Sequence, residues 1–347
     1  MRRRPHTRVA AIAATGLLAA VLTACSQAAP QVQPPPKPAE PPPVVQNVQI
    51  ERILKELSAE LEQAQSESDP AALTGRVGGA ALTMIQAHYA AKAANPEEQP
   101  LDLGTGFADG QIVARSALWP RSFVVVTDSE PTEAPYIYQI GQADARSPYK
   151  MVLWAKMLAG ATVPPAAAAG VGSDVVEPGS DDRTEFSPIA AVQAYVAAKD
   201  DPSGEAAALL DTTVQDGRDP DPARERWSAW VKGWRDNAAT LAGSSVSAAS
   251  ALVEGSVSAL ATADSGALVF AQVKSVLDFS FTPVEGAYVN LVGSQGYLGL
   301  GASTLQAHKS AHIEHLQSVV LAVPPKGADQ PIKVIAVADL PTAVQVE

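Results

Sequence analysis

Apolar residues recur every three or four positions near the start of the regularly patterned part of the chain. They are Val48, Ile50, Ile53, Leu54, Leu57 and Leu61, with Glu and Lys between them. This spacing predicts an amphipathic helix of about four turns. Ser68-Asp69-Pro70 is typical of a new helix start, because Asp can cap the helix and proline fits its first turn. We expect that second helix to be weakened by nearby glycines and to run to about Ala94.

After Pro100 the pattern changes to one typical of β-strands. Apolar, β-branched and aromatic residues predominate in four segments, 112–114, 123–126, 136–140 and 149–157. Turn-forming residues separate them at 128–131 and 145–148. These segments predict an antiparallel sheet packed against the preceding helices.

The order of helices followed by strands then repeats. Ser187-Pro188 predicts the start of a helix that ends at about 200–202, and Pro222 predicts the start of another. Strand-like segments follow at 251–253, 267–273, 276–281, 287–292, 317–323 and 332–337. The expected fold class is therefore α+β, with two consecutive units that each place helices before an antiparallel sheet, in a cystatin-like or nuclear-transport-factor-like manner.

The N-terminus has the order of a signal peptide. Four arginines precede an apolar stretch of about 13 residues, which is shorter than the roughly 20 that a transmembrane helix needs. The stretch ends at Leu22-Thr23-Ala24-Cys25, and Cys25 is the only cysteine. A single cysteine in an exported chain cannot form an internal disulfide, so it needs another role.

Leu22-Thr23-Ala24-Cys25 resembles the lipobox of bacterial lipoproteins. That resemblance implies a diacylglyceryl group on the Cys25 thiol and cleavage before this residue. In composition and layout the chain also resembles uncharacterised actinobacterial lipoproteins. We therefore expect attachment to the cell membrane through lipid on Cys25, with the folded part on the extracytoplasmic face.

The predicted organisation has five parts. They are a signal peptide at 1–24, the lipidated cysteine and a proline-rich spacer at 25–46, a first α+β domain at 47–160, a linker at 161–186, and a second α+β domain at 187–347. Loss of the signal peptide would change the net charge from −12 to −16, because it removes four arginines and no acid. Such a body should repel nucleic acid and anionic lipid surfaces, so a nucleic-acid partner is not expected.

Histidines close to the last strands offer the best candidate metal ligands. His308 and His312 are four residues apart, and Glu314 and His315 follow. The surrounding apolar residues favour a strand, in which His312 and His315 face opposite sides. We therefore favour a surface segment that happens to carry histidines, and predict no metal or other cofactor.

Trp227, Trp230 and Trp234 have helical spacing in a chain with few aromatic residues. They are interpreted first as a core face, and second as an aromatic groove for a peptide or glycan. Acids at 216–221 are interpreted as a solvated turn, since they lack the ligand spacing of a calcium loop.

No nucleophile elbow and no phosphate-binding loop is present in the sequence. The expected function is a non-enzymatic binding or scaffolding role in the cell envelope, with an unknown envelope protein or small ligand as partner. Two alternatives stay open. The protein is a carrier of a small apolar ligand held between helices and sheet, or it is a hydrolase without a recognisable motif.

Overall fold

A computed structural model of the chain describes residues 40–108, 110–128, 134–211, 221–291 and 295–347. Pro41–Glu347 form one compact unit. The signal peptide, Cys25 and most of the proline-rich spacer lie outside the described residues, so what the sequence predicts for them stays a prediction. None of the helices in the described part has the length and apolar character that crossing a membrane requires.

Four α-helices and three short 3₁₀ helices are present in the described ranges. The α-helices are α1 (Asn47–Glu67), α2 (Gly79–Ala94), α3 (Pro188–Asp200) and α4 (Pro222–Ala238). The 3₁₀ helices are η1 (Pro70–Thr74), η2 (Glu205–Leu209) and η3 (Gln295–Leu300).

The helix starts predicted at Pro188 and Pro222 are confirmed. Ser187 accepts a hydrogen bond from the Ala190 N–H at the start of α3, and Asp221 accepts two from backbone N–H groups at the start of α4. The segment at Asp69 forms only the short helix η1, and residues 75–78, with glycines at both ends, separate it from α2. On α1 the predicted apolar positions are buried, except Val48, which is 76% exposed.

Strands make up most of the fold. They are β1 (Ile112–Arg115), β2 (Arg121–Val126), β3 (Tyr136–Gln142), β4 (Lys150–Met157), β5 (Ser173–Asp174), β6 (Ser245–Leu252), β7 (Ser258–Ala261), β8 (Ala267–Ser280), β9 (Val289–Asn290), β10 (Gln306–Ala307), β11 (Ser310–Val323) and β12 (Lys333–Val346). The segments at 267–273 and 276–281, predicted as two strands, form the single strand β8.

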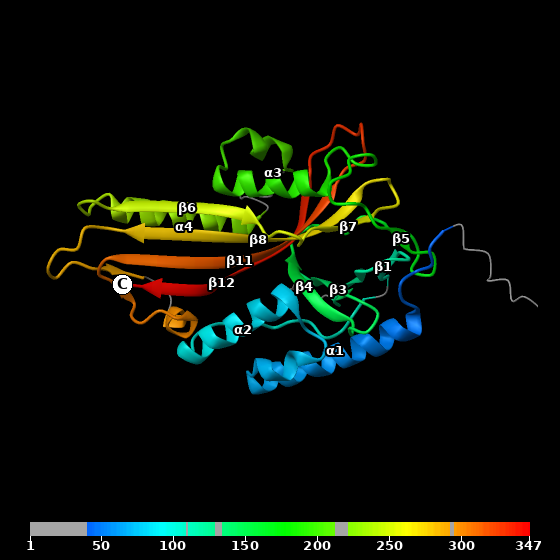
Figure 1. Ribbon diagram of the computed structural model, residues 1–347, viewed down its shortest axis with the longest axis horizontal. Coiled ribbons are helices and arrows are strands. Elements are labelled where there is room, and N and C mark those ends of the chain that lie inside the picture. The colour runs from blue at the N-terminus through cyan, green and yellow to red at the C-terminus, as the bar shows by residue number, and fades with distance from the viewer. Residues whose placement is uncertain (1–39, 109, 129–133, 212–220, 292–294) are drawn as a thin grey trace, which may run out of the picture. The chain divides into compact units, whose positions relative to one another are not determined.

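Ten strands belong to one sheet, whose order is β5-β1-β2-β3-β4-β12-β11-β8-β6, with β7 also paired to β8 (Figure 1). All pairs are antiparallel except β1 with β5. The two halves meet where β12 pairs with β4, at Ala336 opposite Met157 and at Val337 opposite Lys156.

The predicted fold of two separate helix-and-sheet units is therefore wrong. The described part is mostly one large mixed sheet of ten strands, with a separate two-stranded sheet of β9 and β10 and comparatively few helices. The alternation of apolar and polar residues identifies a strand, but it does not show which strand will hydrogen-bond to its edge. Here the last strand, β12, pairs with the edge of β4, so the strands of the two halves form one sheet.

Helices cover both faces of the long strands. On one face of β11, Ser318 contacts Met84 of α2. On the other face, Gln317 contacts Tyr195 of α3 and His315 contacts Trp227 of α4. The largest apolar cluster joins α1, α2 and the first strands, and it also includes Phe270 and Val320 from the second half.

Candidate functional site

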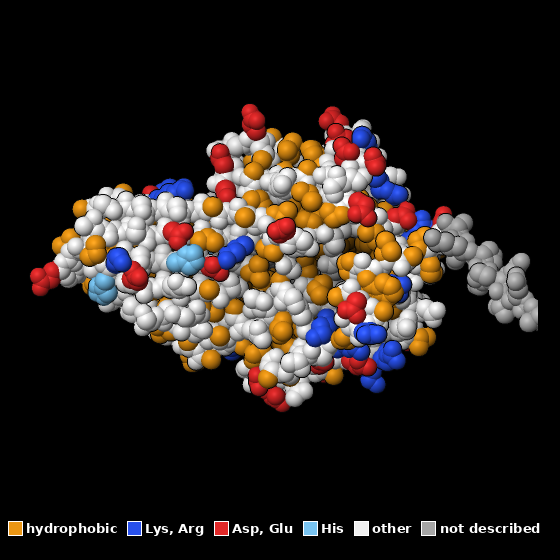
Figure 2. Space-filling model, viewed as in Figure 1, with side chains coloured by type: hydrophobic (Ala, Val, Ile, Leu, Met, Phe, Trp, Pro, Cys, Tyr) orange, Lys and Arg blue, Asp and Glu red, His pale blue; other side chains and the backbone are white. Residues whose placement is uncertain are grey.

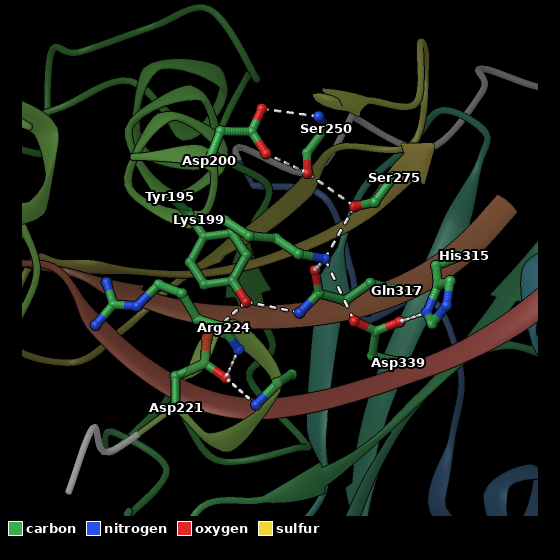
Figure 3. Close-up of polar contacts among 11 residues, drawn as sticks. Tyr195, Lys199, Asp200, Asp221, Arg224, Ser250, Ser275, His315, Gln317 and Asp339 are labelled. Carbon is green, nitrogen blue, oxygen red and sulfur yellow. Dashed lines mark hydrogen bonds and ion pairs between the residues drawn. The ribbon is translucent and has the colours of Figure 1, made fainter. Parts of the chain in front are cut away.

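A row of polar side chains crosses four neighbouring strands beneath α3 and α4 (Figure 3). Ser250 of β6 lies opposite Ser275 of β8, and Gln317 of β11 lies opposite Asp339 of β12. Apolar clusters lie on either side of the row, one under α3 and the other under α4. Polar groups in such a position need partners, because an unpaired polar group in an apolar core is costly.

Lys199 supplies the central charge of this network. It lies near the end of α3 and is 0% exposed. Its Nζ donates to Ser275 Oγ and to Gln317 Oε1, each at 2.9 Å, and lies 3.3 Å from Asp339 Oδ2. Three partners match the three N–H donors of an ammonium group.

Asp339 is the counter-charge of Lys199. Burial alone would raise the pKa of Asp339, but Lys199 and the hydrogen bond with His315 outweigh it and lower the pKa to about 2. His315 Nδ1 is 2.9 Å from Asp339 Oδ1, and the imidazole packs against the rings of Trp227 and Trp230. Thus Asp339 is ionised at neutral pH and orients His315 beneath α4.

A second branch of the network holds the start of α4. Gln317 Nε2 donates to the Tyr195 hydroxyl at 2.6 Å, and that hydroxyl donates to Asp221 Oδ2 at 2.6 Å. Burial raises the pKa of Tyr195 well above its ordinary value, and burial also raises the pKa of Asp221. Asp221 is 0% exposed and is therefore not part of a solvated turn, whereas residues 216–220 of that predicted turn lie outside the described residues. Asp221 caps a helix instead.

The network is closed to substrates. Lys199, Ser275 and Gln317 are each 0% exposed, so the Ser275–Lys199 hydrogen bond does not place a nucleophile in a cleft. Each of these side chains hydrogen-bonds another member of the network. The network ties α3 to the sheet through Lys199, and it ties the start of α4 through Asp221. It thereby positions the tryptophans of α4.

A small pocket lies beside Trp230 and Trp234 of α4. Its volume is about 150 Å³, and its lining consists of Trp230, Gly233, Trp234, Asn237, Val289, Asn290, Leu291 and Tyr297. Trp230 is half-buried, Trp234 is 8% exposed, and their ring centroids are 6.2 Å apart in an edge-to-face arrangement. Asn237 and Asn290 are exposed at the pocket mouth.

The pocket lining carries no charge in the described residues. Burial raises the pKa of Tyr297 to about 12, so this phenol is neutral at physiological pH. A Cβ added at Gly233 would meet no atom within 4 Å, which shows that the pocket extends over this glycine. The pocket therefore combines aromatic side chains, the two amides of Asn237 and Asn290, and open space next to Gly233 of α4.

A second, wider hollow of about 530 Å³ lies beside η2. Its lining is mixed, with carboxylates at Glu185, Asp211 and Asp329 next to Phe186 and Leu210. A wall with three carboxylates does not match an apolar ligand. The carrier alternative gains no support from this hollow.

The three tryptophans form part of the core, as first interpreted, and a role of any of them in binding a peptide or glycan stays a prediction. Trp227 is 4% exposed and packs under α4 with His315, whereas Trp230 and Trp234 reach the pocket.

The candidate metal-binding histidines lie in three different environments. His308 Nδ1 is 3.2 Å from the Ala287 carbonyl, and His312 contacts Asp278 and Glu314 on the opposite face of β11 from His315. In the described part of the chain no group of three or more His, Cys, Asp or Glu side chains has an arrangement that holds a metal ion.

Sequence reasoning missed Lys199 and Asp339 as partners. A signal was present for Lys199, which is four residues after Tyr195 and therefore on the apolar stripe of its helix. Asp339 lies 140 residues farther along the chain, so no local pattern indicates that the two side chains meet.

Comparison of the chain with protein-family models, with curated proteins and with solved structures found no match.

Proposed function

We propose that the protein is a lipid-anchored, extracytoplasmic binding protein that holds a neutral, ring-shaped polar ligand, such as one sugar residue of an envelope glycan, in the pocket beside α4. The observation that carries this proposal is the pocket lining, which joins Trp230 and Trp234 to the amides of Asn237 and Asn290 with no charged group. Attachment through Cys25 rests on the signal peptide and lipobox.

The chemistry of the lining selects the ligand class. An indole ring packs against the apolar face of a sugar, while amide groups both donate to and accept from hydroxyls. A pocket of about 150 Å³ is smaller than the roughly 300–1,000 Å³ pockets that enclose drug-sized ligands. It therefore suits a single ring of a longer glycan whose remainder lies in solvent.

The same lining supports a non-enzymatic role. It contains no carboxylate, imidazole, thiol, amine or aliphatic hydroxyl in the described residues, and Tyr297 keeps its proton at neutral pH. General acid–base catalysis and covalent catalysis both need such a group within hydrogen-bond reach of the substrate.

Tryptophan fluorescence tests the proposal directly. Neutral di- and tetrasaccharides of glucose, galactose, mannose or arabinose are titrated into the protein, and at least one should change the emission saturably because Trp230 and Trp234 line the pocket. Asn237→Ala should weaken that binding by roughly 2- to 10-fold, the effect of losing one hydrogen bond.

Gly233→Leu is the sharpest variant. The leucine side chain would enter the open space of the pocket and abolish binding, while replacement of glycine within a helix should keep or raise the melting temperature. Ala229→Leu is the matched control, because Ala229 is exposed on α4 and does not line the pocket. Unchanged binding by Gly233→Leu, no saturable response to any neutral sugar, or turnover of a bound sugar would contradict the proposal.

A further inference from the structure

Apolar side chains gather on the surface where β1, β5 and the start of α1 meet, as Figure 2 shows for the end of the molecule that carries β1 and β5 in Figure 1. Leu118 and Trp119, in the β1–β2 connection, are 74% and 41% exposed. Val171 and Val175 flank β5 and are 58% and 44% exposed. Exposed apolar groups that cluster in this way are typical of an interaction surface.

The chain leaves the folded body beside the same strand. Pro43 forms a β-bridge with Arg115, and the Val44 N–H donates to the Ala114 carbonyl at 2.9 Å. Val44 and Val45 are buried, so this point is tied to the sheet. Leu118 is only three positions after Arg115. The register of β5 places Ser173 and Asp174 next to Ala114 and Arg115. The apolar surface therefore adjoins the attachment point of the N-terminal segment.

The length of that segment limits the distance between this surface and a lipid on Cys25. Seventeen residues lie between Cys25 and Pro43, and even a fully extended chain of that length spans no more than about 65 Å from Cys25 to Pro43. A tether of this size keeps the body at a millimolar effective concentration near the bilayer. A weak affinity of the surface for lipid is then sufficient to hold it there.

The acid on β5, Asp174, is paired with two arginines. Asp174 is held between Arg115 at 2.5 Å and Arg183 at 3.3 Å, so its charge is compensated. The Arg121 guanidinium lies 4.1 Å from the centre of the Trp119 ring, and its Nε is buried without a hydrogen-bond partner among the described residues. Tryptophan with a neighbouring arginine is a pair that suits the headgroup region of a bilayer.

We propose that the β1–β2 connection, with Leu118 and Trp119 at its tip, inserts into the surface of the membrane that carries the lipid anchor. The partner is the phospholipid bilayer itself, and the contact is mainly apolar. This inference rests on the anchoring through Cys25 proposed above. It orients the body with β1 and β5 toward the lipid and leaves the sugar pocket on a separate part of the surface.

The test uses the mature chain from Cys25 to Glu347, with its single thiol coupled to a maleimide-bearing lipid in phosphatidylcholine vesicles. Brominated acyl chains quench tryptophan only when the ring reaches the bilayer. Coupled wild-type protein should lose part of its emission in brominated vesicles, and Trp119→Phe should abolish that loss. Replacing both Leu118 and Trp119 by Ser should remove the contact, whereas Val284→Ser, a change at an exposed valine of the β8–β9 connection, is the matched control and should retain it.

The outcomes separate this proposal from the anchoring on which it rests. Chemical coupling replaces lipidation in the cell, so absence of lipid on Cys25 in cells would overturn the anchoring and would not alter the quenching. Equal emission in brominated and ordinary vesicles, or quenching that persists in Trp119→Phe, would overturn membrane insertion. Self-association of the coupled protein that is lost in the Leu118 and Trp119 double variant, without quenching, would also overturn it and would assign the surface to a second copy.

Discussion

Lys199 and Asp339 are removed from solvent together, and each depends on the other. Taking both charges out of water carries a desolvation cost that only their attraction and their hydrogen bonds offset. Lys199 has Ser275 and Gln317 as additional partners, and Asp339 has His315. Removal of one charge leaves the other buried without compensation, so the pair determines the stability of the whole contact between α3 and the sheet.

Asp339→Asn should therefore lower the free energy of unfolding by about 3–5 kcal/mol, because it leaves the Lys199 ammonium buried without a counter-charge. Urea unfolding followed by circular dichroism measures the change. The double variant Lys199→Met with Asp339→Leu should recover a large part of the loss, since neither charge is then present. The single variants Lys199→Met and Asp339→Leu are measured alongside it. A loss of stability in the double variant that equals the sum of the losses in these two single variants would contradict this account.

The pH dependence of stability follows from the lowered pKa of Asp339. The folded pKa is about 2, whereas an unfolded aspartate has a pKa of about 3.9. Because the folded pKa is the lower one, the ion pair stabilises the protein above about pH 4, and its contribution of about 2.5 kcal/mol is lost as the pH falls through about 2. The raised pKa of Asp221 acts in the opposite sense, since ionising this group costs stability.

Comparing wild type with Asp339→Asn across this range isolates the contribution of Asp339. Their difference in unfolding free energy should shrink between about pH 4 and pH 2. A constant difference would show that Asp339 is not the group that titrates.

At the scale of elements, the 3₁₀ helix η3 packs unusually closely on α2. A Cβ added at Gly299 would lie 2.0 Å from the Ala90 carbonyl oxygen, and one added at Gly296 would lie 3.0 Å from the Ala91 Cβ. Tyr297 lies between these glycines and lines the pocket. The two glycines thus allow η3 to approach α2 and bring Tyr297 to the pocket.

Gly299→Ala should consequently destabilise the protein by about 1–3 kcal/mol, the usual cost of overpacking, because backbone atoms of α2 must shift. It should also weaken sugar binding by displacing Tyr297. Gly179→Ala is the matched control, since a Cβ there meets no atom within 4 Å, and it should leave stability unchanged or raise it slightly. Thermal unfolding of both variants provides the measurement, and equal melting temperatures would contradict the packing argument.

At the scale of the whole molecule, the folded part is one unit whose two halves share a sheet and a core. Phe270 and Val320 of the second half lie in the same apolar cluster as α1 and α2. The pocket beside α4 and the apolar surface beside β1 therefore belong to the same compact unit. Such an arrangement suits a protein that contacts the membrane at one place and its ligand at another.

Lipidation at Cys25 is the prediction on which the location of this unit depends. Mass spectrometry of the N-terminal peptide from membranes should recover a diacylated or triacylated Cys25 as the first residue. Cys25→Ala should abolish acylation of this peptide. An unmodified Cys25 in an uncleaved chain would contradict the anchoring.

The sequence by itself determined the features that depend on neighbouring residues. Helix starts at Pro188 and Pro222 follow from caps and proline geometry, and the strands follow from local alternation, although their ends shifted and 267–280 is one strand instead of two. The predicted strand at His312 also placed this residue and His315 on opposite faces, as the structure does. The export signal and the Cys25 lipobox are likewise local patterns, and they remain predictions.

Tertiary structure alone decided the sheet order and both parts of the candidate site. The pairing of β12 with β4 joins residues about 180 positions apart, and the pocket joins α4 to the segment around Asn290 and Tyr297. Every strand edge offers the same backbone donors and acceptors, so hydrogen bonding alone does not determine which strands pair. The pairing is determined by the arrangement that buries the apolar faces of all strands and helices together. That selection brings Lys199 to Asp339, and no periodicity along the chain encodes it.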